Sequence, residues 1–124
     1  EFILLAFFKL RTQNFDSAKK WLGYIKNPET MLVKKQQGYY NYLHGLMVSQ
    51  TSITQAEKYL KKAVSLGLSM DHDLAMAKLQ LAGIAMTKRR KREATMLMNE
   101  AKKLDKHGML KDQIQQLKQQ LKRI

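Results

Sequence analysis

The feature that most constrains how this chain folds is a repeat with a fixed period of 38 residues. Identical apolar or small residues recur at that spacing in three successive stretches of the chain. A period in this range indicates that one supersecondary unit is copied along the chain, and that stacked copies bury a continuous core. The two clearest series are Leu5, Leu43 and Leu81, and Ala18, Ala56 and Ala94.

Each unit is expected to hold two helices joined by a short polar turn. In the middle unit, the apolar positions 53, 56, 60, 63 and 64 follow a spacing of mostly threes and fours, which places them on one face of a helix. We therefore predict helices over 34–49 and 53–66, with the turn Gln50-Thr51-Ser52 between them. Ala56 on the second helix, and Gly45 and Gly83 on first helices, leave room for two helices to cross closely.

These units resemble the tetratricopeptide repeat, a family of stacked helix–turn–helix hairpins of about 34 residues. The resemblance implies an all-α fold: a right-handed solenoid of three hairpins in a single domain, 1–124, with repeats over about 2–30, 34–68 and 72–106. Three features depart from the family pattern: the longer period, His44 in place of a small residue, and proline at position 28 alone. The resemblance rests on Leu43, Ala56, Tyr59-Leu60 and Ala63, and on Leu81-Ala82, Ala94, Met98 and Ala101.

A narrow apolar stripe marks the last segment of the sequence. It runs along a Gln- and Lys-rich stretch, and a helix of this kind, over about 109–124, is expected to cap the open end of the stack. The same spacing fits a coiled-coil seam, but the stripe is shorter than the three to four heptads that favour one. Its members step by four and three residues: Leu110, Ile114, Leu117, Leu121 and Ile124.

The resemblance also implies a function, because first helices of successive hairpins in the family line a concave groove that binds peptides. The chain would then be a non-catalytic protein-interaction scaffold. Here the groove is apolar and rich in methionine, which suits an amphipathic helix as its ligand. The alternative occupants are a segment that precedes this sequence or a second copy of the chain. The predicted groove residues are Ile3, Phe7, Leu10, Asn41, Gly45, Val48, Met76, Leu79, Gly83 and Met86.

Charge gives a second functional signal. The chain has 23 Lys and Arg against 10 Asp and Glu, a formal net charge of +13, which favours anionic partners. The densest basic run falls in the predicted turn of the third unit. This turn is expected either to be solvated or to contact the phosphates of nucleic acid, the headgroups of an anionic lipid surface or an acidic partner protein. The predicted anion-binding residues are Lys88, Arg89, Arg90, Lys91 and Arg92.

The sequence offers little support for catalysis, a cofactor or a metal site. Cysteine is absent, and no Ser/His/Asp set, phosphate-binding glycine loop or HExxH motif is present. Asp71 and Asp73 flank His72, but adjacent positions on a helix point in different directions. The two acids are therefore expected as the cap and a first-turn residue of a helix. His44 stands alone, and its expected role is an interhelical hydrogen bond.

The first apolar segment raises the question of what covers it. Residues 2–8 are apolar all round, and a helix of that kind is normally covered on every side. Because the sequence starts at Glu1 rather than at methionine, we expect a preceding membrane anchor or an earlier repeat to cover it, or else a homodimer contact. The chain is expected in the cytoplasm. With an anchor, its positive charge would suit the cytoplasmic face of a membrane.

Overall fold

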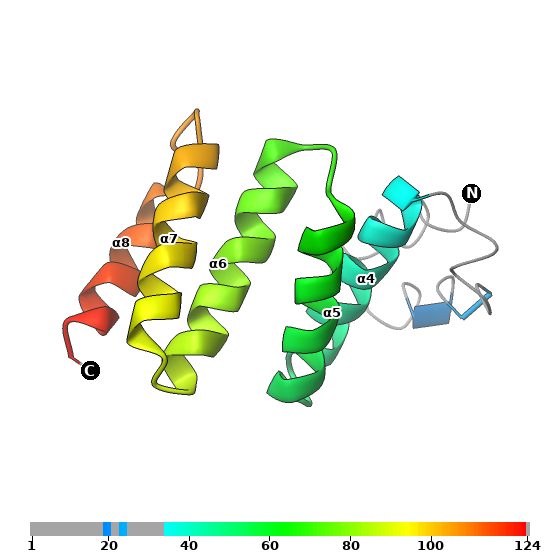
Figure 1. The fold of residues 1–124 in the computed structure, drawn as a ribbon, viewed down its shortest axis with the longest axis horizontal. Coiled ribbons are helices and arrows are strands. Elements are labelled where there is room, and N and C mark those ends of the chain that lie inside the picture. The colour runs from blue at the N-terminus through cyan, green and yellow to red at the C-terminus, as the bar shows by residue number, and fades with distance from the viewer. Residues whose placement is uncertain (1–18, 21–22, 25–33, 124) are drawn as a thin grey trace. The chain divides into compact units, whose positions relative to one another are not determined.

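The computed structural model describes residues 19–20, 23–24 and 34–123, and within these residues all regular structure is helical (Figure 1). The all-α class is therefore confirmed. The chain divides after Gly67 into two compact units. Ile3, Phe7 and Leu10 of the predicted first repeat lie outside the described residues. The helices are α4 (Lys34–Val48), α5 (Ile53–Leu66), α6 (Asp71–Thr87), α7 (Lys91–Leu104) and α8 (Lys111–Leu121).

Helices α4 and α5 make up most of the described part of the first unit, and they pack as a hairpin. Their bounds match the predicted helices closely. Ser52 is the N-cap of α5, and its hydroxyl oxygen accepts a hydrogen bond from the Gln55 N–H at 3.3 Å. This bond satisfies an amide that the helix itself leaves open. Gly67 ends α5 with a φ of 99° and donates its N–H to the Ala63 carbonyl at 3.0 Å.

The close crossing predicted for this hairpin is present at Gly45. A Cβ atom at this position would lie 2.7 Å from Leu60 Cγ, which is closer than two carbon atoms can approach without a shift. Leu60 is fully buried, with Ala56 and Ala63 on the same face of α5. Ile53, at the start of the predicted apolar face, is 41% exposed. The spacing in the sequence therefore identifies the buried face but extends it one turn too far.

His44 contacts α5 through its ring rather than through the predicted hydrogen bond. The ring stacks on Tyr59 of α5 with centroids 5.2 Å apart, and the Tyr40 ring lies 4.5 Å away, centroid to centroid. Among the described residues, the buried Nε2 atom of His44 has no hydrogen-bond partner. The prediction of an interhelical hydrogen bond is therefore wrong for this atom. Burial lowers the pKa of His44 below its ordinary value, because a buried site disfavours the charged form.

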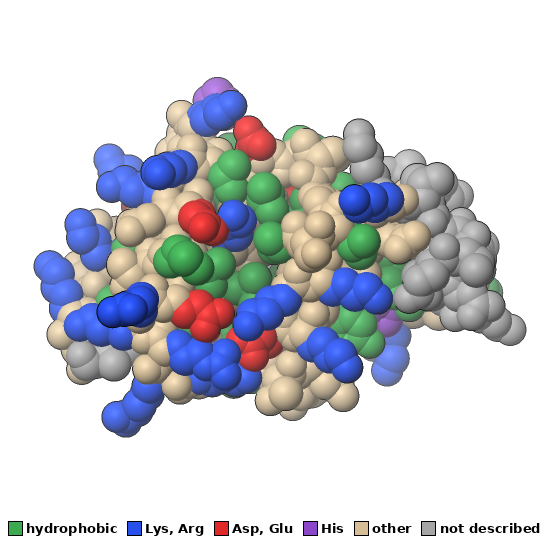
Figure 2. Space-filling view, viewed as in Figure 1, with side chains coloured by type: hydrophobic (Ala, Val, Ile, Leu, Met, Phe, Trp, Pro, Cys, Tyr) green, Lys and Arg blue, Asp and Glu red, His purple; other side chains and the backbone are tan. Residues whose placement is uncertain are grey.

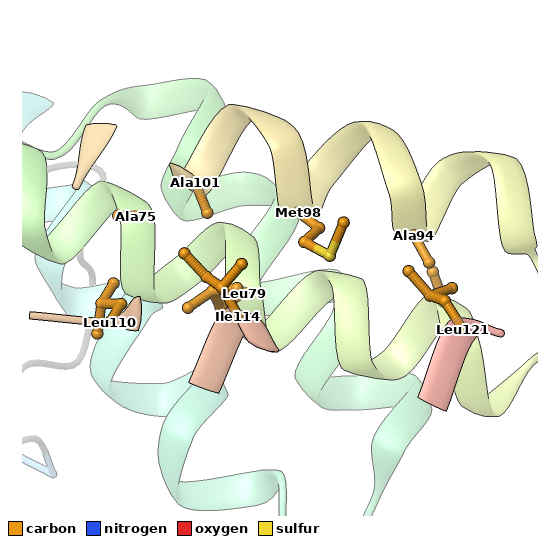
Figure 3. Packing of buried hydrophobic residues seen from close by; sticks show 9 residues of the cluster. Ala75, Leu79, Ala94, Met98, Ala101, Leu110, Ile114 and Leu121 are labelled. Carbon is orange, nitrogen blue, oxygen red and sulfur yellow. The ribbon is translucent and has the colours of Figure 1, made fainter. Parts of the chain in front are cut away.

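Helices α6, α7 and α8 form the second unit. α6 and α7 pair as a hairpin, and α8 packs on both of them. Ala94, Met98 and Ala101 repeat the buried positions of α5 with the 38-residue period, and all three are buried again. Side chains from the three helices converge in one core (Figure 3). Its buried members are Ala75, Leu79, Ala85, Ala94, Met98, Ala101, Leu110, Ile114 and Leu121.

Gly83 does not repeat the tight crossing at Gly45. Among the described residues, no atom lies within 4 Å of the place where its Cβ would be. The prediction that Gly83 allows a close helix crossing is therefore wrong. The repeat places Met98 in the third unit where Leu60 stands in the second, and Met98 packs into the core that includes α8. Its side chain therefore contributes to the contact with the last helix.

The apolar stripe predicted for the last helix lies on the core side of α8. Leu110, Ile114 and Leu121 are buried, and Leu117 packs against the same core. Ile124, the last member of the stripe, lies outside the described residues. None of the described helices is long and apolar enough to cross a membrane.

Carboxylates lie at the ends of α6 and α7 opposite the basic run. Asp105 accepts hydrogen bonds from the N–H groups of Met109 and Leu110 at 3.0 and 2.9 Å, which holds the short connection from α7 to α8. Asp71 and Asp73 lie in the first turn of α6, as predicted. The N-cap, however, is Met70 rather than an acid. Because the connection is short, α8 runs antiparallel to α7.

Candidate anion-binding site

The predicted basic run spans the end of α6 and the start of α7. Lys88, Arg89 and Arg90 form the turn, whereas Lys91 and Arg92 are the first two residues of α7. All of them except Lys88 are exposed. The N-terminal end of a helix carries a partial positive charge, so cations are unfavourable there. This run of cations is therefore destabilised both by repulsion among its own charges and by the partial positive charge at the start of α7.

Arg89 holds the left-handed position of the turn, with a φ of 59°. Its N–H donates to the Met86 carbonyl at 2.9 Å, and the Arg90 N–H donates to the Ala85 carbonyl at 2.7 Å. This pair of bonds is the Schellman ending of a helix, in which glycine is usual at the left-handed residue. The other residues with positive φ in the described part of the chain are both glycines. An L side chain in this conformation costs about 1–2 kcal/mol.

Arg90 takes the N-cap position of α7. Its guanidinium carries only donors, so it cannot accept a hydrogen bond from the open N–H groups of the helix. Its Nη1 atom lies 3.7 Å from Glu93 Oε2. Ser52 stands 38 residues earlier and does cap α5. The same repeat position is thus a capping residue in one hairpin and a cation in the other.

The end of α8 brings two more cations to this end of the second unit. Arg89 and Arg123 line one concavity of about 390 Å³, together with Met86, Thr87 and Gln120. In Figure 1 the α6–α7 turn and the last residues of α8 lie at the same end of their helices. We call seven cations the basic end: Lys88, Arg89, Arg90, Lys91, Arg92, Lys122 and Arg123.

Within the described part of the chain, neither Arg89 nor Arg123 makes an ion pair with an acid. Figure 2 shows that Lys and Arg side chains outnumber acids on the visible face over α7 and α8. The sequence prediction missed Lys122 and Arg123. Their place depends on the antiparallel course of α8, which brings the residues after Leu121 to the same end of the unit as the α6–α7 turn.

A second concavity, of about 330 Å³, lies between α7 and α8. Lys102, Lys111 and Lys118 line it together with Asp105. The Asp105 carboxylate already accepts two backbone hydrogen bonds. The three ammonium groups stand on flexible stems. This concavity is positively charged, but it lacks the fixed backbone position that distinguishes Arg89.

The predicted groove residues of the first unit lie on α4. Asn41 is buried, and its Nδ2 donates to the Gln37 carbonyl at 2.8 Å. Gly45 faces Leu60, as described above. Val48, the last residue of α4, is half-buried. Of these side chains, Asn41 is already engaged within its own helix.

The predicted groove residues of the second unit lie on α6. Leu79 is only 5% exposed and belongs to the core. Met76 and Met86 are half-buried and pack against that core. Gly83 is also half-buried, and no atom of the described residues lies within 4 Å of the place of its Cβ. Because the two sets of groove residues belong to different units, the groove stays a prediction.

In the described residues, no group of three or more His, Asp or Glu side chains is placed to hold a metal ion. Comparison of the chain with protein-family models, with curated proteins and with solved structures finds no match. The resemblance to tetratricopeptide repeats therefore stays a prediction.

Proposed function

We propose that this chain is a non-catalytic protein-interaction module whose contact surface is the basic end, and that its partner carries an acidic segment. The observation that carries the proposal is the difference in residue type between the two interhelical turns. Where the first hairpin has Thr51 and Ser52, the second has Arg89 and Arg90. Arg90 stands at the N-cap position of α7 without capping it, and Arg89 occupies a left-handed backbone position. Residues that lower local stability in this way are typical of functional sites.

The charge at the basic end supports an anionic partner. Seven Lys and Arg gather there from two segments of the sequence, and Glu93, the acid beside the run, contacts Arg90. Exposed charges of one sign raise the rate of encounter with the opposite sign more than they raise affinity. Binding through this surface is therefore expected to weaken as salt concentration rises.

The architecture expected from the resemblance belongs to the same proposal. In it, three hairpins stack as a right-handed solenoid of tetratricopeptide type, with α8 as the capping helix. The burial of equivalent positions on α5 and α7 supports it. The apolar groove is a less favoured contact surface, because Leu79 is packed in the core. A cytoplasmic location, a membrane anchor and a homodimer stay predictions.

The test compares two variants of equal net charge. One replaces Lys88, Arg89, Arg90, Lys91 and Arg92 with Gln. The matched control replaces five exposed lysines outside the turn with Gln: Lys58, Lys102, Lys103, Lys111 and Lys118. Binding of a fluorescent Glu-rich peptide, and of its Gln-rich counterpart, is followed by anisotropy from about 0.05 to 0.3 M salt.

The proposal expects the Glu-rich peptide to bind the wild-type chain and the control variant, and not the basic-end variant. Equal loss in both variants would show that total charge, rather than this surface, attracts the peptide. The same titration with an oligonucleotide and with anionic vesicles tests the other partners. If either of these binds at about 0.15 M salt when the peptide does not, nucleic acid or lipid replaces the protein partner.

A further inference from the structure

Resting on this proposed function, we infer that the concavity between the α6–α7 turn and the end of α8 is a binding site for one phosphate monoester. The source would be a phosphorylated serine or threonine side chain of the protein partner. Two arginines from segments 34 residues apart in the sequence, Arg89 and Arg123, line this single concavity. A ligand bound there is within reach of both side chains, whereas a linear track would offer its cations one after another.

The residues around the concavity suit a tetrahedral anion. Guanidinium groups present planar pairs of N–H donors that bind phosphate oxygens in a bidentate way. Gln120 also lines the concavity, and its side chain carries amide N–H donors. The Thr87 hydroxyl donates to the Gly83 carbonyl at 3.0 Å, so its oxygen is oriented by α6 and not by solvent. Met86 supplies an apolar wall.

The position of Arg89 is held by the backbone. The two Schellman hydrogen bonds fix the turn. Glycine at position 89 would adopt this left-handed conformation with less steric strain. The residue present is instead a long cation that makes no ion pair within the described part of the chain. Left-handed strain at a non-glycine residue points toward function when an unpaired charge accompanies it.

Charge favours a monoester over a diester. A phosphorylated side chain carries about −1.5 to −2 charges at neutral pH and presents three acceptor oxygens. Two guanidinium groups match that charge and offer two pairs of N–H donors to those oxygens. A diester, as in a nucleic-acid backbone or in phosphatidylglycerol, carries one charge, and strong binding needs several of them in succession. Arg89 and Arg123 converge on one place, so the single dianion fits better.

The test uses two pairs of single substitutions at the basic end. Arg89→Gln and Arg123→Gln remove the lining guanidiniums. Arg92→Gln and Lys122→Gln remove neighbouring exposed cations that do not line the concavity. The probes are a Ser/Gly peptide with one phosphoserine, the same peptide unphosphorylated, and inorganic phosphate against chloride at equal ionic strength. Calorimetry measures the affinities, and circular dichroism checks that each variant is folded.

We expect Arg89→Gln and Arg123→Gln each to weaken phosphopeptide binding about tenfold or more, because each removes charge-assisted hydrogen bonds. The two control substitutions should change it by less than about threefold, the effect of one exposed charge. Arg89→Gly should bind as weakly as Arg89→Gln while being more stable than the wild-type chain. Its loss of binding therefore cannot come from unfolding.

Equal weakening by all four substitutions would overturn the phosphate site. Equal affinity for the phosphorylated and unphosphorylated peptides would do the same. In both cases the proposed function survives if the Glu-rich peptide still depends on the basic end. An oligonucleotide without a terminal phosphate, or phosphatidylglycerol vesicles, should bind the two lining variants as well as they bind the two controls. If they lose binding only with Arg89→Gln and Arg123→Gln, the site recognises diesters and the inference is wrong.

Discussion

The hairpins α4–α5 and α6–α7 occupy successive positions of the 38-residue period, yet they differ most where their helices are joined. Their buried faces agree position by position: Ala56 with Ala94, and Ala63 with Ala101. Their turns do not. The first turn has no residue with positive φ among those described, and its last residue, Ser52, caps the next helix. The second turn has a left-handed arginine followed by an arginine at the cap position.

This difference shows that buried positions and turn positions of the hairpins are constrained in different ways. Positions that bury apolar surface keep their residue type, because a change there opens a cavity or causes a clash. Turn positions carry less packing, so they accept residues that lower stability by about 1 kcal/mol each. The second hairpin exposes a concentration of positive charge at that cost. The turn is therefore the place where two copies of one fold acquire different surfaces.

The largest expected effect lies at the helix crossing. Gly45→Ala should lower the free energy of unfolding by about 1–3 kcal/mol, because the added Cβ would lie 2.7 Å from Leu60 Cγ. Urea denaturation followed by circular dichroism measures the change. In the double variant with Leu60→Ala, the clash is relieved. Its loss of unfolding free energy should therefore be smaller than the sum of the losses of the two single variants. Full additivity would mean that Gly45 and Leu60 do not meet.

The next effect has the opposite sign. Arg89→Gly should raise the free energy of unfolding by about 1–2 kcal/mol, because glycine adopts a φ of 59° without the steric strain of a side chain. Thr51→Gly is the matched control at the same repeat position in the first turn. Thr51 lacks a positive φ, so glycine there should be neutral or lower stability by about 0.5 kcal/mol. Equal shifts from both substitutions would remove the contrast between the turns.

Substitutions at the two N-cap positions should change the free energy of unfolding by about 1 kcal/mol each, in opposite directions. Ser52→Ala removes the acceptor for the Gln55 N–H and should destabilise the chain. Arg90→Ser supplies an acceptor that α7 lacks at its N-cap and should stabilise the chain. Thermal unfolding of the two variants side by side gives the signs. A loss of stability with Arg90→Ser would indicate that the 3.7 Å contact between Arg90 and Glu93 contributes more than a cap does.

Gly83→Ala should raise stability by about 0.5–1 kcal/mol, the difference in helix propensity between the two residues. Among the described residues, no atom lies near the added Cβ, so propensity alone decides the result. Chemical denaturation beside Gly45→Ala gives a matched pair of opposite sign. If Gly83→Ala destabilised the chain, a contact at that position outside the described residues would be required.

The smallest effect is the pH dependence of stability that comes from His44, a repeat position at which the second hairpin has Ala82. Burial lowers the pKa of His44 in the folded chain below the ordinary value of 6.5. Between these two pKa values the unfolded chain binds more protons, so the free energy of unfolding falls as pH is lowered below about 6.5, and is fully retained above it. His44→Phe keeps the stack on Tyr59 and should flatten this dependence in urea titrations at several pH values. His107→Gln, at an exposed histidine, should leave the slope caused by His44 in place.

Much of the fold follows from sequence spacing, because burial on a helix face imposes a period that can be read directly. The bounds of α4 and α5 and the stripe on α8 were predicted in this way. Gly83 and His44 were predicted wrongly, since their environment depends on which side chain stands opposite. Met98 stands at the repeat position of Leu60 and packs into the core shared with α8, and no described atom lies within 4 Å of a Cβ at Gly83.

The site was only partly predictable. Five of its seven cations form one run that is visible in the sequence. Arg123 joins them through the antiparallel course of α8, which spacing alone does not show. The left-handed backbone at Arg89 was also invisible, because arginine gives no local signal for that conformation.

The way α8 is docked has a thermodynamic consequence. Arg123 stands just beyond α8, whereas Arg89 belongs to the α6–α7 turn, so a ligand held by both residues is held only while α8 is in place. By linkage, such a ligand lowers the equilibrium constant for local opening of α8, up to the factor by which that opening weakens ligand binding. Amide hydrogen exchange would then report occupancy at a distance. Protection would rise along Lys111–Leu121, including amides that the ligand never touches.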